Sequence, residues 1–218
     1  MPVLKNVEAF LLAGGKSSRM GRDKAFLKLS GVPMFQRTAD LLTSLVTKTT
    51  LVISASQSVN PHDTNATNPY SNFGLPTLTD SWPSFGPLGG IATALANAQS
   101  KWCLILACDM PFLTKEWLTF LLGHTAQSET DTALKIDAIV PKTNRGLEPL
   151  CAIYRASCAP ILATALDRGV RKVTEALADL NLHRIPENEW RQFSPDGNLF
   201  GNLNTWQDYL EAQQRLKS

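Results

Sequence analysis

The sequence predicts an α/β fold in which helices cover a largely parallel sheet. Short apolar runs alternate with amphipathic stretches along the chain, a pattern typical of β-α-β units. The continuous apolar run 102–107 favours a central strand buried on both faces. At 218 residues the chain can bury one full core, so a single domain is the simplest interpretation.

The spacing of apolar residues predicts each element in turn. We expect strands over 7–13, 50–53, 102–107, 138–141 and 150–154. We expect helices over 34–46, 88–98, 115–122, 156–166, 170–180 and 205–216. Pro87 stands at the first turn of the second helix, a favoured position for proline. Residues 55–76 are dense in Ser, Asn, Thr and Pro, which predicts a long surface loop.

Composition and charge exclude several classes of protein. The formal charge of +2 comes without a dense Lys/Arg run, which argues against a nucleic-acid-binding protein. No window approaches the roughly 18 apolar residues of a membrane span, and the N-terminus does not resemble a signal peptide. The four cysteines form no C-x-x-C pair, which argues against zinc and against a disulfide scaffold. We therefore expect a cytoplasmic protein.

The segment 11–24, LLAGGKSSRMGRDK, follows the first predicted strand and suits a polyphosphate. Gly14 and Gly15 allow positive φ and close approach of the backbone to a ligand, and successive N–H groups in such a turn can form an anion site. Four nearby cations would add charge-assisted donors: Lys16, Arg19, Arg22 and Lys24. A solvated basic loop is the alternative. The segment matches neither the Walker-type nor the G-x-G-x-x-G fingerprint.

Asp109 in LACDMP, 106–111, is the second candidate. It comes directly after a predicted buried strand, at the edge of the sheet where α/β proteins build their sites. A carboxylate there can hold Mg²⁺, which typically uses one or two carboxylates together with substrate phosphates. The alternative is that Asp109 only caps the next turn.

Two further segments combine polar groups with turn residues. In LTDSWPSFGPLGG, 78–90, Asp80 is followed by glycines around the start of a helix, where anions are favoured; tight packing without a ligand is the alternative. In FGNLNT, Asn202 and Asn204 would share a face of an extended segment. Asn204 or Thr205 would equally serve as the N-cap of the last helix.

In this order and spacing, the motifs resemble molybdenum cofactor guanylyltransferases, a group within the wider nucleotidyltransferase family. The matching pieces span residues 7 to 210: LAGG, RMG-x-DK, G-x-P, TDSWPSFGPLGG, ACDMP, LEPLCAIY and NLNT. The resemblance implies a Rossmann-like three-layer sandwich with a mostly parallel central sheet, like that of the nucleotide-diphospho-sugar transferases. Within one domain, the nucleotide-binding part would cover about 1–110 and the acceptor-binding part about 111–218.

The resemblance also implies roles for single residues. Those that would line the guanine and ribose are Leu12, Ala13 and Gly14. Those that would meet the triphosphate are Gly15, Arg19 and Lys24. Asp80 would contact the nucleotide, Asp109 would carry Mg²⁺, and Asn202 and Asn204 would lie near the metal or the acceptor phosphate. Family members often have an Asn after the second strand that touches the base, and this chain has Ser54 there.

The implied reaction transfers GMP from GTP to the terminal phosphate of molybdopterin, as molybdenum cofactor, and releases pyrophosphate. A phosphate nucleophile is already ionised at neutral pH, so catalysis can rest on alignment and charge neutralisation without a general base. We assign Lys24 and Arg19 to neutralising the triphosphate, and Asp109 to holding the ion. Arg171 and Lys172 are candidates for binding the acceptor phosphate; a solvated helix face is the alternative.

Two other functions remain open. One is the same fold with another base, such as a molybdopterin cytidylyltransferase, although LAGG rather than LAAG favours guanine by family habit. The other is a non-catalytic nucleotide-binding protein, against which the presence of both Lys24 and Asp109 argues. The expected partners are GTP, molybdopterin and, transiently, other cofactor-pathway proteins. We expect a monomer.

Overall fold

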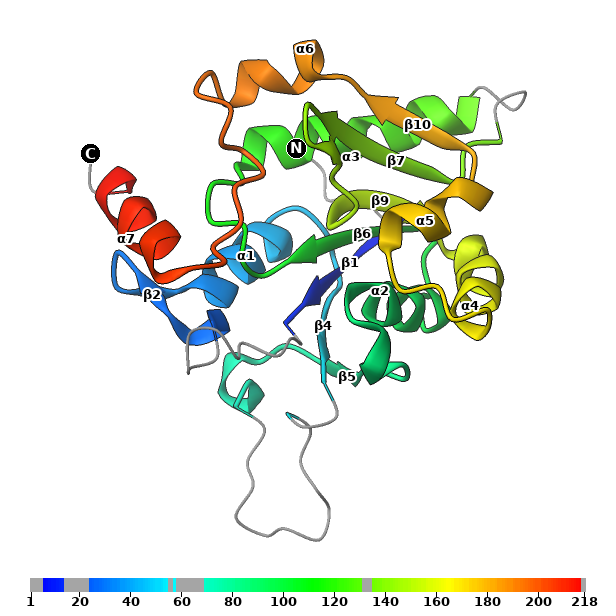
Figure 1. The fold of residues 1–218 in the computed structure, drawn as a ribbon, viewed down its shortest axis with the longest axis horizontal. Helices are drawn as coiled ribbons and strands as arrows, with labels where there is room; N and C mark the ends of the chain where they lie inside the picture. The colour runs from blue at the N-terminus through cyan, green and yellow to red at the C-terminus, as the bar shows by residue number, and fades with distance from the viewer. Residues whose placement is uncertain (1–5, 14–23, 55–56, 58–68, 131–134, 217–218) are drawn as a thin grey trace, which may run out of the picture.

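The computed structural model describes residues 6–13, 24–54, 57, 69–130 and 135–216, which form an α/β structure around one large sheet (Figure 1). The strands are β1 (Val7–Leu12), β2 (Lys28–Leu29), β3 (Val32–Pro33), β4 (Thr49–Ile53), β5 (Thr77–Thr79), β6 (Trp102–Ala107), β7 (Ala138–Thr143), β8 (Gly146–Leu147), β9 (Cys151–Arg155) and β10 (Leu182–Ile185). β2 and β3 form a separate small hairpin.

The predicted, mostly parallel sheet is confirmed. Its strands lie in the order β10-β7-β9-β6-β1-β4-β5, with β8 paired to β7. β1 runs parallel to β4 and β6, and β5 runs parallel to β4, so the carboxyl ends of these four strands share one edge. β9 is antiparallel to both of its neighbours, β6 and β7. The strands that carry the candidate residues therefore end on the same side of the sheet.

The helices are α1 (Met34–Thr43), α2 (Pro87–Ala96), α3 (Lys115–Thr130), α4 (Ala159–Asp167), α5 (Val173–Ala176), α6 (Glu187–Trp190) and α7 (Trp206–Arg215). Short 3₁₀ turns lie at Lys24–Phe26, Ser71–Phe73, Pro83–Phe85, Ala156–Cys158, Leu177–Asp179 and Arg191–Phe193. Among the residues that the structure describes, no helix has both the length and the apolar character needed to cross a membrane.

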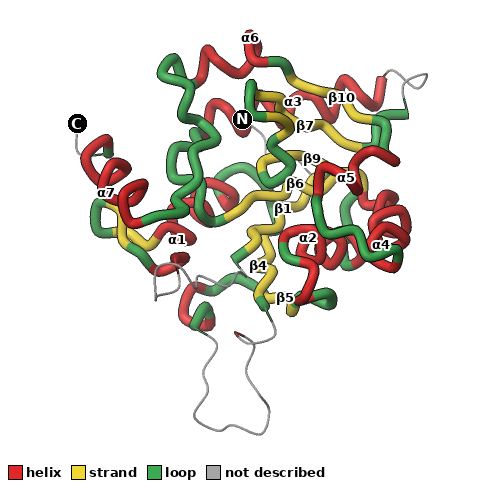
Figure 2. The backbone as a smooth tube through the Cα atoms, in the orientation of Figure 1, coloured by secondary structure: helices red, strands yellow, loops and turns green. Residues whose placement is uncertain are grey.

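Helices cover both faces of the sheet and give the predicted three-layer sandwich (Figure 2). On one face, α1 packs against β1 and α3 against β9, in a core that includes Phe35, Trp117 and Leu11. On the other face, α2 and α4 pack through residues such as Ile91 and Leu162. Successive residues of β1 enter the two cores alternately, because side chains of a strand point to opposite faces. All six are buried, which explains why this strand has a continuous apolar pattern interrupted only at Glu8.

Glu8 is a buried carboxylate that fastens the amino end of β1. Its Oε1 accepts hydrogen bonds from the backbone N–H groups of Gln99 and Ser100, and its Oε2 forms an ion pair with Lys48 Nζ at 3.0 Å. A buried charge is tolerated when it is paired and hydrogen-bonded in this way. Since Lys48 precedes β4 and Ser100 precedes β6, one side chain ties together the starts of three central strands.

Most predicted elements form, but several of their ends differ. α1 ends at Thr43 instead of 46, and α3 continues to Thr130 instead of ending at 122. A single helix over 170–180 is wrong, because the chain is still extended at Lys172 and only α5 and a 3₁₀ turn follow. The strand β10, which pairs in parallel with β7, was not expected from its four-residue sequence.

The predicted surface loop over 55–76 is wrong at its C-terminal end. Tyr70 is fully buried, and its ring lies 5.1 Å from that of Phe35 and 5.0 Å from that of Phe26. Phe73 contacts Phe35 edge-on at 4.4 Å. Two aromatic residues thus anchor a segment whose polar composition suggested exposure. Residues 55–56 and 58–68 lie outside the described residues.

Two histidines with unrelated sequence positions meet near the edge of the sheet. The ring of His124, on α3, lies 5.1 Å from that of His183, on β10, and contacts Phe120 edge-on at 4.9 Å. Burial lowers the pKa of His124, and His183 lowers it further, whereas Glu189 acts in the opposite direction. The folded state therefore disfavours protonation of His124.

The protein should lose stability as the pH falls below about 6.5, the ordinary pKa of histidine. In that range the unfolded chain binds a proton at residue 124 that the folded chain disfavours, so the free energy of unfolding decreases with decreasing pH. Replacing His124 by Phe keeps an aromatic ring and should reduce this loss. Urea denaturation at pH 7.5 and pH 5.5 measures it; an equal loss in both proteins would contradict the assignment.

Candidate active site

The candidate site lies where β1 and β6 end. The two strands are parallel and in register, with Leu12 opposite Ala107, and the N–H of Cys108 donates to the carbonyl of Leu12 at 3.2 Å. Ala13 and Asp109, the residues that follow, therefore leave the sheet side by side. Gly14, Gly15 and Arg19 lie outside the described residues, so the structure shows only the two ends of the glycine-rich segment.

Asp109 is half-buried, and a hydrogen bond to its backbone carbonyl fixes its position. The N–H of Leu203 donates to its carbonyl at 3.1 Å, which brings the segment 200–204 to the end of β6. Burial raises the pKa of the Asp109 carboxyl, and the charge of Lys24 acts against this rise. Beside Leu203, the Oδ1 atom of Asn202 is buried and accepts no hydrogen bond from the part of the chain that the structure describes. The Asp109 carboxylate and the Asn202 side-chain oxygen thus belong to adjoining segments.

Lys24 reaches the same segment from the opposite end of the chain. Its Nζ donates to Oδ1 of Asn204 at 3.2 Å, across 180 positions of sequence. Asn204 is not the N-cap of α7, because Thr205 has this role. The Thr205 hydroxyl accepts from the N–H of Asp208, and the Asp208 carboxylate accepts from the N–H of Thr205, which completes a capping box. The side chain of Asn204 is therefore directed to the site instead of the helix.

Asp80 fastens the turn that leads into α2. Its Oδ1 accepts from the N–H of Trp82 at 2.8 Å and from the hydroxyl of Thr93 at 3.0 Å. A Cβ at Gly89 would lie only 2.3 Å from the carbonyl oxygen of Trp82, so this turn requires glycine for packing. No described residue donates to Oδ2 of Asp80, which leaves one carboxylate oxygen for a ligand. The structural role and the predicted nucleotide contact are thus compatible.

Ser54 is engaged with a residue that the sequence analysis did not single out. Both its N–H and its hydroxyl donate to Oε1 of Gln57 at 3.1 Å. Gln57 Nε2 donates to the Tyr70 hydroxyl at 3.4 Å, and that hydroxyl donates to the carbonyl of Ala13 at 3.3 Å. This chain of contacts connects the ends of β1 and β4. An isolated Gln in a polar segment carries no pattern that would have revealed it.

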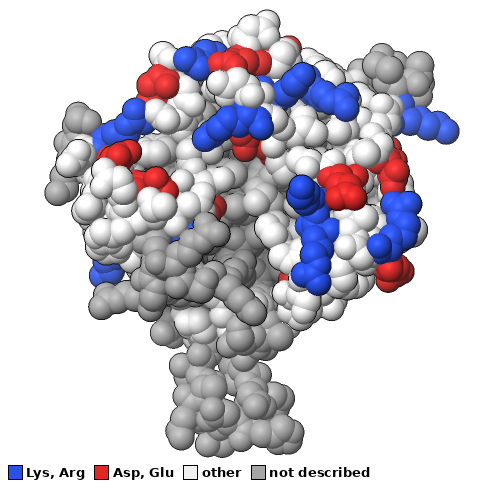
Figure 3. Space-filling model, viewed as in Figure 1, with Lys and Arg blue, Asp and Glu red and all other residues white. Residues whose placement is uncertain are grey.

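Arg171 and Lys172 are both exposed. Of the two, Arg171 contacts the part of the chain that was predicted to bind the nucleotide. Its guanidinium donates to the carbonyl of Ser84 at 3.0 Å and lies 5.3 Å from the ring centre of Phe85, in the turn before α2. The face seen in Figure 3 is hollowed near its centre, and Lys and Arg side chains stand along the upper and right-hand edges of the hollow. These cations suit an anionic ligand.

Glu148 is a second carboxylate beside the end of β6. The N–H of Ala107 donates to the carbonyl of Leu150, so the segment that begins β9 runs next to the end of β6. Burial raises the pKa of Glu148, and a hydrogen bond from the Thr143 hydroxyl at 3.1 Å opposes this rise. Residue 148 belongs to the LEPLCAIY piece of the resemblance, but neither spacing nor family pattern assigned it a role.

Comparison with known proteins identifies the family of the chain. Residues 9–181 match the model of the MobA-like NTP transferase domain. A probable molybdenum cofactor guanylyltransferase of Clostridium perfringens is 32% identical over 204 residues, which cover 92% of this chain and 93% of that protein. A molybdenum cofactor guanylyltransferase of Desulfosudis oleivorans is 30% identical over 213 residues, which cover 97% of this chain and 96% of that protein.

Solved structures share the fold over nearly the whole chain. The molybdopterin-guanine dinucleotide biosynthesis protein A of Archaeoglobus fulgidus is 26% identical, with a TM-score of 0.79 and coverage of 96% of this chain and 98% of that one. A 4-diphosphocytidyl-2C-methyl-D-erythritol synthase of Anaerococcus prevotii, 11% identical with a TM-score of 0.66, covers 98% of this chain and 97% of that one, and shares the fold alone. Because the domain match covers most of the chain and the relatives align over nearly its whole length, the chain belongs to the MobA-like NTP transferase family.

Proposed function

We propose that this protein transfers GMP from GTP to the phosphate of molybdopterin, in the molybdenum cofactor, and releases pyrophosphate. The observation that carries the proposal is the meeting of Lys24, Asp109 and Asn204 at the common end of β1 and β6. A cation, a carboxylate and an amide at one sheet edge suit a charged phosphate substrate. Family relatives that carry the name molybdenum cofactor guanylyltransferase support this choice of reaction.

The nucleotide would occupy the carboxyl ends of the first strands. In this proposal the residues that line it are Leu12, Ala13, Gly14, Gly15, Ser54 and Asp80. Leu12 is close-packed against α2, since a Cβ at Gly90 would lie 3.4 Å from its side chain. This packing keeps the end of β1 against the start of the helix, where backbone N–H groups favour anions.

We propose Mg²⁺ as the cofactor, with Asp109 as its ligand. The donor set fits, because Mg²⁺ prefers oxygen ligands and the buried Oδ1 of Asn202, which no described residue pairs, offers a second oxygen in the adjoining segment. The raised pKa of Asp109 indicates that its charge is poorly solvated, so a nearby cation would stabilise the ionised form. When bound, the ion would neutralise charge on the phosphates.

The protein's own residues would act through charge and alignment. Lys24 and Arg19 would neutralise the triphosphate as pyrophosphate leaves. Asn204 holds the Lys24 ammonium in place through its Oδ1. The acceptor phosphate is already ionised at neutral pH, so no general base is needed. Arg171 and Lys172 would attract that phosphate, with Arg171 anchored on the turn before α2.

The remaining parts of the proposal concern the compartment, the oligomeric state and the partners. The protein would act in the cytoplasm as a monomer and hand its product on through transient contact with other cofactor-pathway proteins. The rival functions are a molybdopterin cytidylyltransferase and a nucleotide-binding protein without activity. The family's wider fold accommodates both, so nucleotide choice and turnover must be measured separately.

GTP with Mg²⁺ should raise the melting temperature more than CTP, ATP or UTP. A ligand at about 100 times its Kd stabilises the native state by about 2.7 kcal/mol, which corresponds to about 5–10 °C for a domain of this size. A thermal-shift series with and without Mg²⁺ measures it. A larger shift with CTP would favour the cytidylyltransferase, and nucleotide binding without pyrophosphate release in the presence of molybdopterin would favour the inactive binder.

Asp109→Asn should lower GMP transfer by at least about 100-fold, as removal of one electrostatic group from a reacting phosphate site typically does. The same change should raise the melting temperature of the metal-free protein at pH 7. Because burial raises the pKa of Asp109 above its unfolded value, its ionised form disfavours folding at that pH, and Asn removes this charge. Near-normal transfer by this variant would refute the assignment.

Lys24→Met should reduce GMP transfer by about 100- to 1000-fold, because the charge on the triphosphate would lose a preorganised cation. Lys28→Met is a matched control, since Lys28 is exposed on β2 and should leave the rate unchanged. Transfer assays with both variants under saturating GTP measure the effect. Equal rates for the two variants would show that Lys24 has no special place in the reaction.

A further inference from the structure

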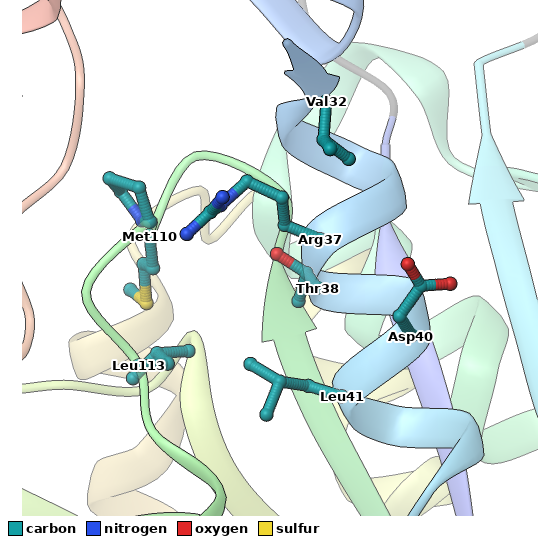
Figure 4. Close-up of a pocket in the computed structure, with 8 residues that line it drawn as sticks. Val32, Arg37, Thr38, Asp40, Leu41, Met110 and Leu113 are labelled. Carbon is teal, nitrogen blue, oxygen red and sulfur yellow. The ribbon is translucent and has the colours of Figure 1, made fainter. Parts of the chain in front are cut away.

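A separate cavity lies between α1 and the segment that follows Asp109. Its volume is about 390 Å³, within the usual range of small-molecule sites. Its walls come from α1 and from residues 110–113, and none of Lys24, Asp109 or Asn204 lines it. Figure 4 shows the cavity open between the helix and this segment. It is therefore distinct from the candidate active site, although its wall begins at the next residue after Asp109.

Two charged residues, Arg37 and Asp40, line this cavity. In Figure 4 its guanidinium projects from α1 toward Met110, whereas the carboxylate of Asp40 points away from it. The Nε atom of Arg37 is buried, and among the described residues none accepts a hydrogen bond from it or forms an ion pair with this side chain. The Asp40 carboxylate accepts instead from Gln36 Nε2 at 2.6 Å. The guanidinium is thus a cation whose buried donor the fold leaves without an acceptor.

An unpaired buried donor is unfavourable, and an anion is the acceptor that stabilises a guanidinium most strongly. Its planar N–H groups match the two oxygens of a carboxylate or a phosphate, so one anion can accept from Nε and from a terminal nitrogen together. The donor cannot be removed by deprotonation, because the guanidinium keeps its proton in proteins. The cavity therefore selects for a negatively charged group at Arg37.

The rest of the cavity is mainly apolar. Met110 and Leu113 are buried beneath it, and Leu41 and Pro111 form further parts of its wall. Val32, at its edge, is one of the few large apolar residues that remain exposed, at 36%. Burial of such surface by a ligand is favourable in proportion to the apolar area removed from water. A bare inorganic anion would leave this surface uncovered.

We propose that the cavity binds a small organic anion, with its carboxylate or phosphate on Arg37 and its apolar body against Val32, Leu41 and Leu113. This site is additional to the proposed transferase reaction and does not rest on it. Carboxylates and phosphates share the chemistry that Arg37 recognises, so the test compares both. A ligand here contacts the same short segment that carries Asp109, and its binding is measurable without any assay of transfer.

The test is a methyl NMR titration of the full chain, with Ile, Leu, Val and Met methyl groups labelled. The probes are benzoate, phenyl phosphate and the neutral analogue benzamide. Benzoate or phenyl phosphate should shift the methyl signals of Val32, Leu41 and Leu113 saturably, with an affinity at least about tenfold above that of benzamide, as expected for a hydrogen-bonded charge. The better of the two anions identifies the ligand's head group.

Arg37→Met should weaken anion binding by at least about tenfold while the methyl signals of residues away from the cavity stay as in the wild type. Arg184→Met is the matched control, because Arg184 is exposed on β10 and should bind the probes like the wild type. If the Met variant does not fold, Arg37→Gln, which keeps a polar side chain without the charge, should show the same loss. Equal anion affinity in wild type and Arg37 variants, equal binding of benzamide, or shifts confined to Leu12 would overturn the proposal.

Discussion

The parallel ladder between β1 and β6 is the constraint on which the rest of the site depends. Six Cα pairs, from Val7 with Trp102 to Leu12 with Ala107, hold the strands in register. Glu8 fastens the amino ends of these strands, and the bond between Cys108 and Leu12 closes the carboxyl ends. A slip of one residue would exchange the faces of every side chain on a strand, and both faces are packed. The two site segments therefore emerge together.

Two aspartates of the site, Asp80 and Asp109, each follow a strand but differ in how the fold stabilises their charge. Asp80 uses one carboxylate oxygen to hold Trp82 and Thr93, so part of its charge is already stabilised by the fold. The charge of Asp109 is only partly stabilised by the fold. Burial raises the pKa of its carboxyl, and the charge of Lys24 is the main influence that lowers it. Residues that the fold destabilises are common at functional sites, because the missing stabilisation comes from the ligand.

The C-terminal segment completes the site from far along the chain. Leu203 bonds to the backbone of Asp109, and Asn204 accepts from Lys24. The capping box of Thr205 and Asp208 fixes where α7 begins and so determines which of the neighbouring side chains points outward. The start of α7 thus sets the position of the Asn204 side chain, which contacts Lys24 near the other end of the chain.

The sequence by itself determined the central strands, most of the helices that cover them and the position of Asp109 after a buried strand. It could do so because apolar periodicity and turn residues act over a few neighbouring positions. Only the tertiary structure decided that Lys24 meets Asn204, that Gln57 and Tyr70 connect β1 with β4, and that His124 meets His183. These contacts join residues that local propensity does not relate. Arg37 belongs with them, because packing of α1 against the segment after Asp109 buries its Nε without an acceptor among the described residues.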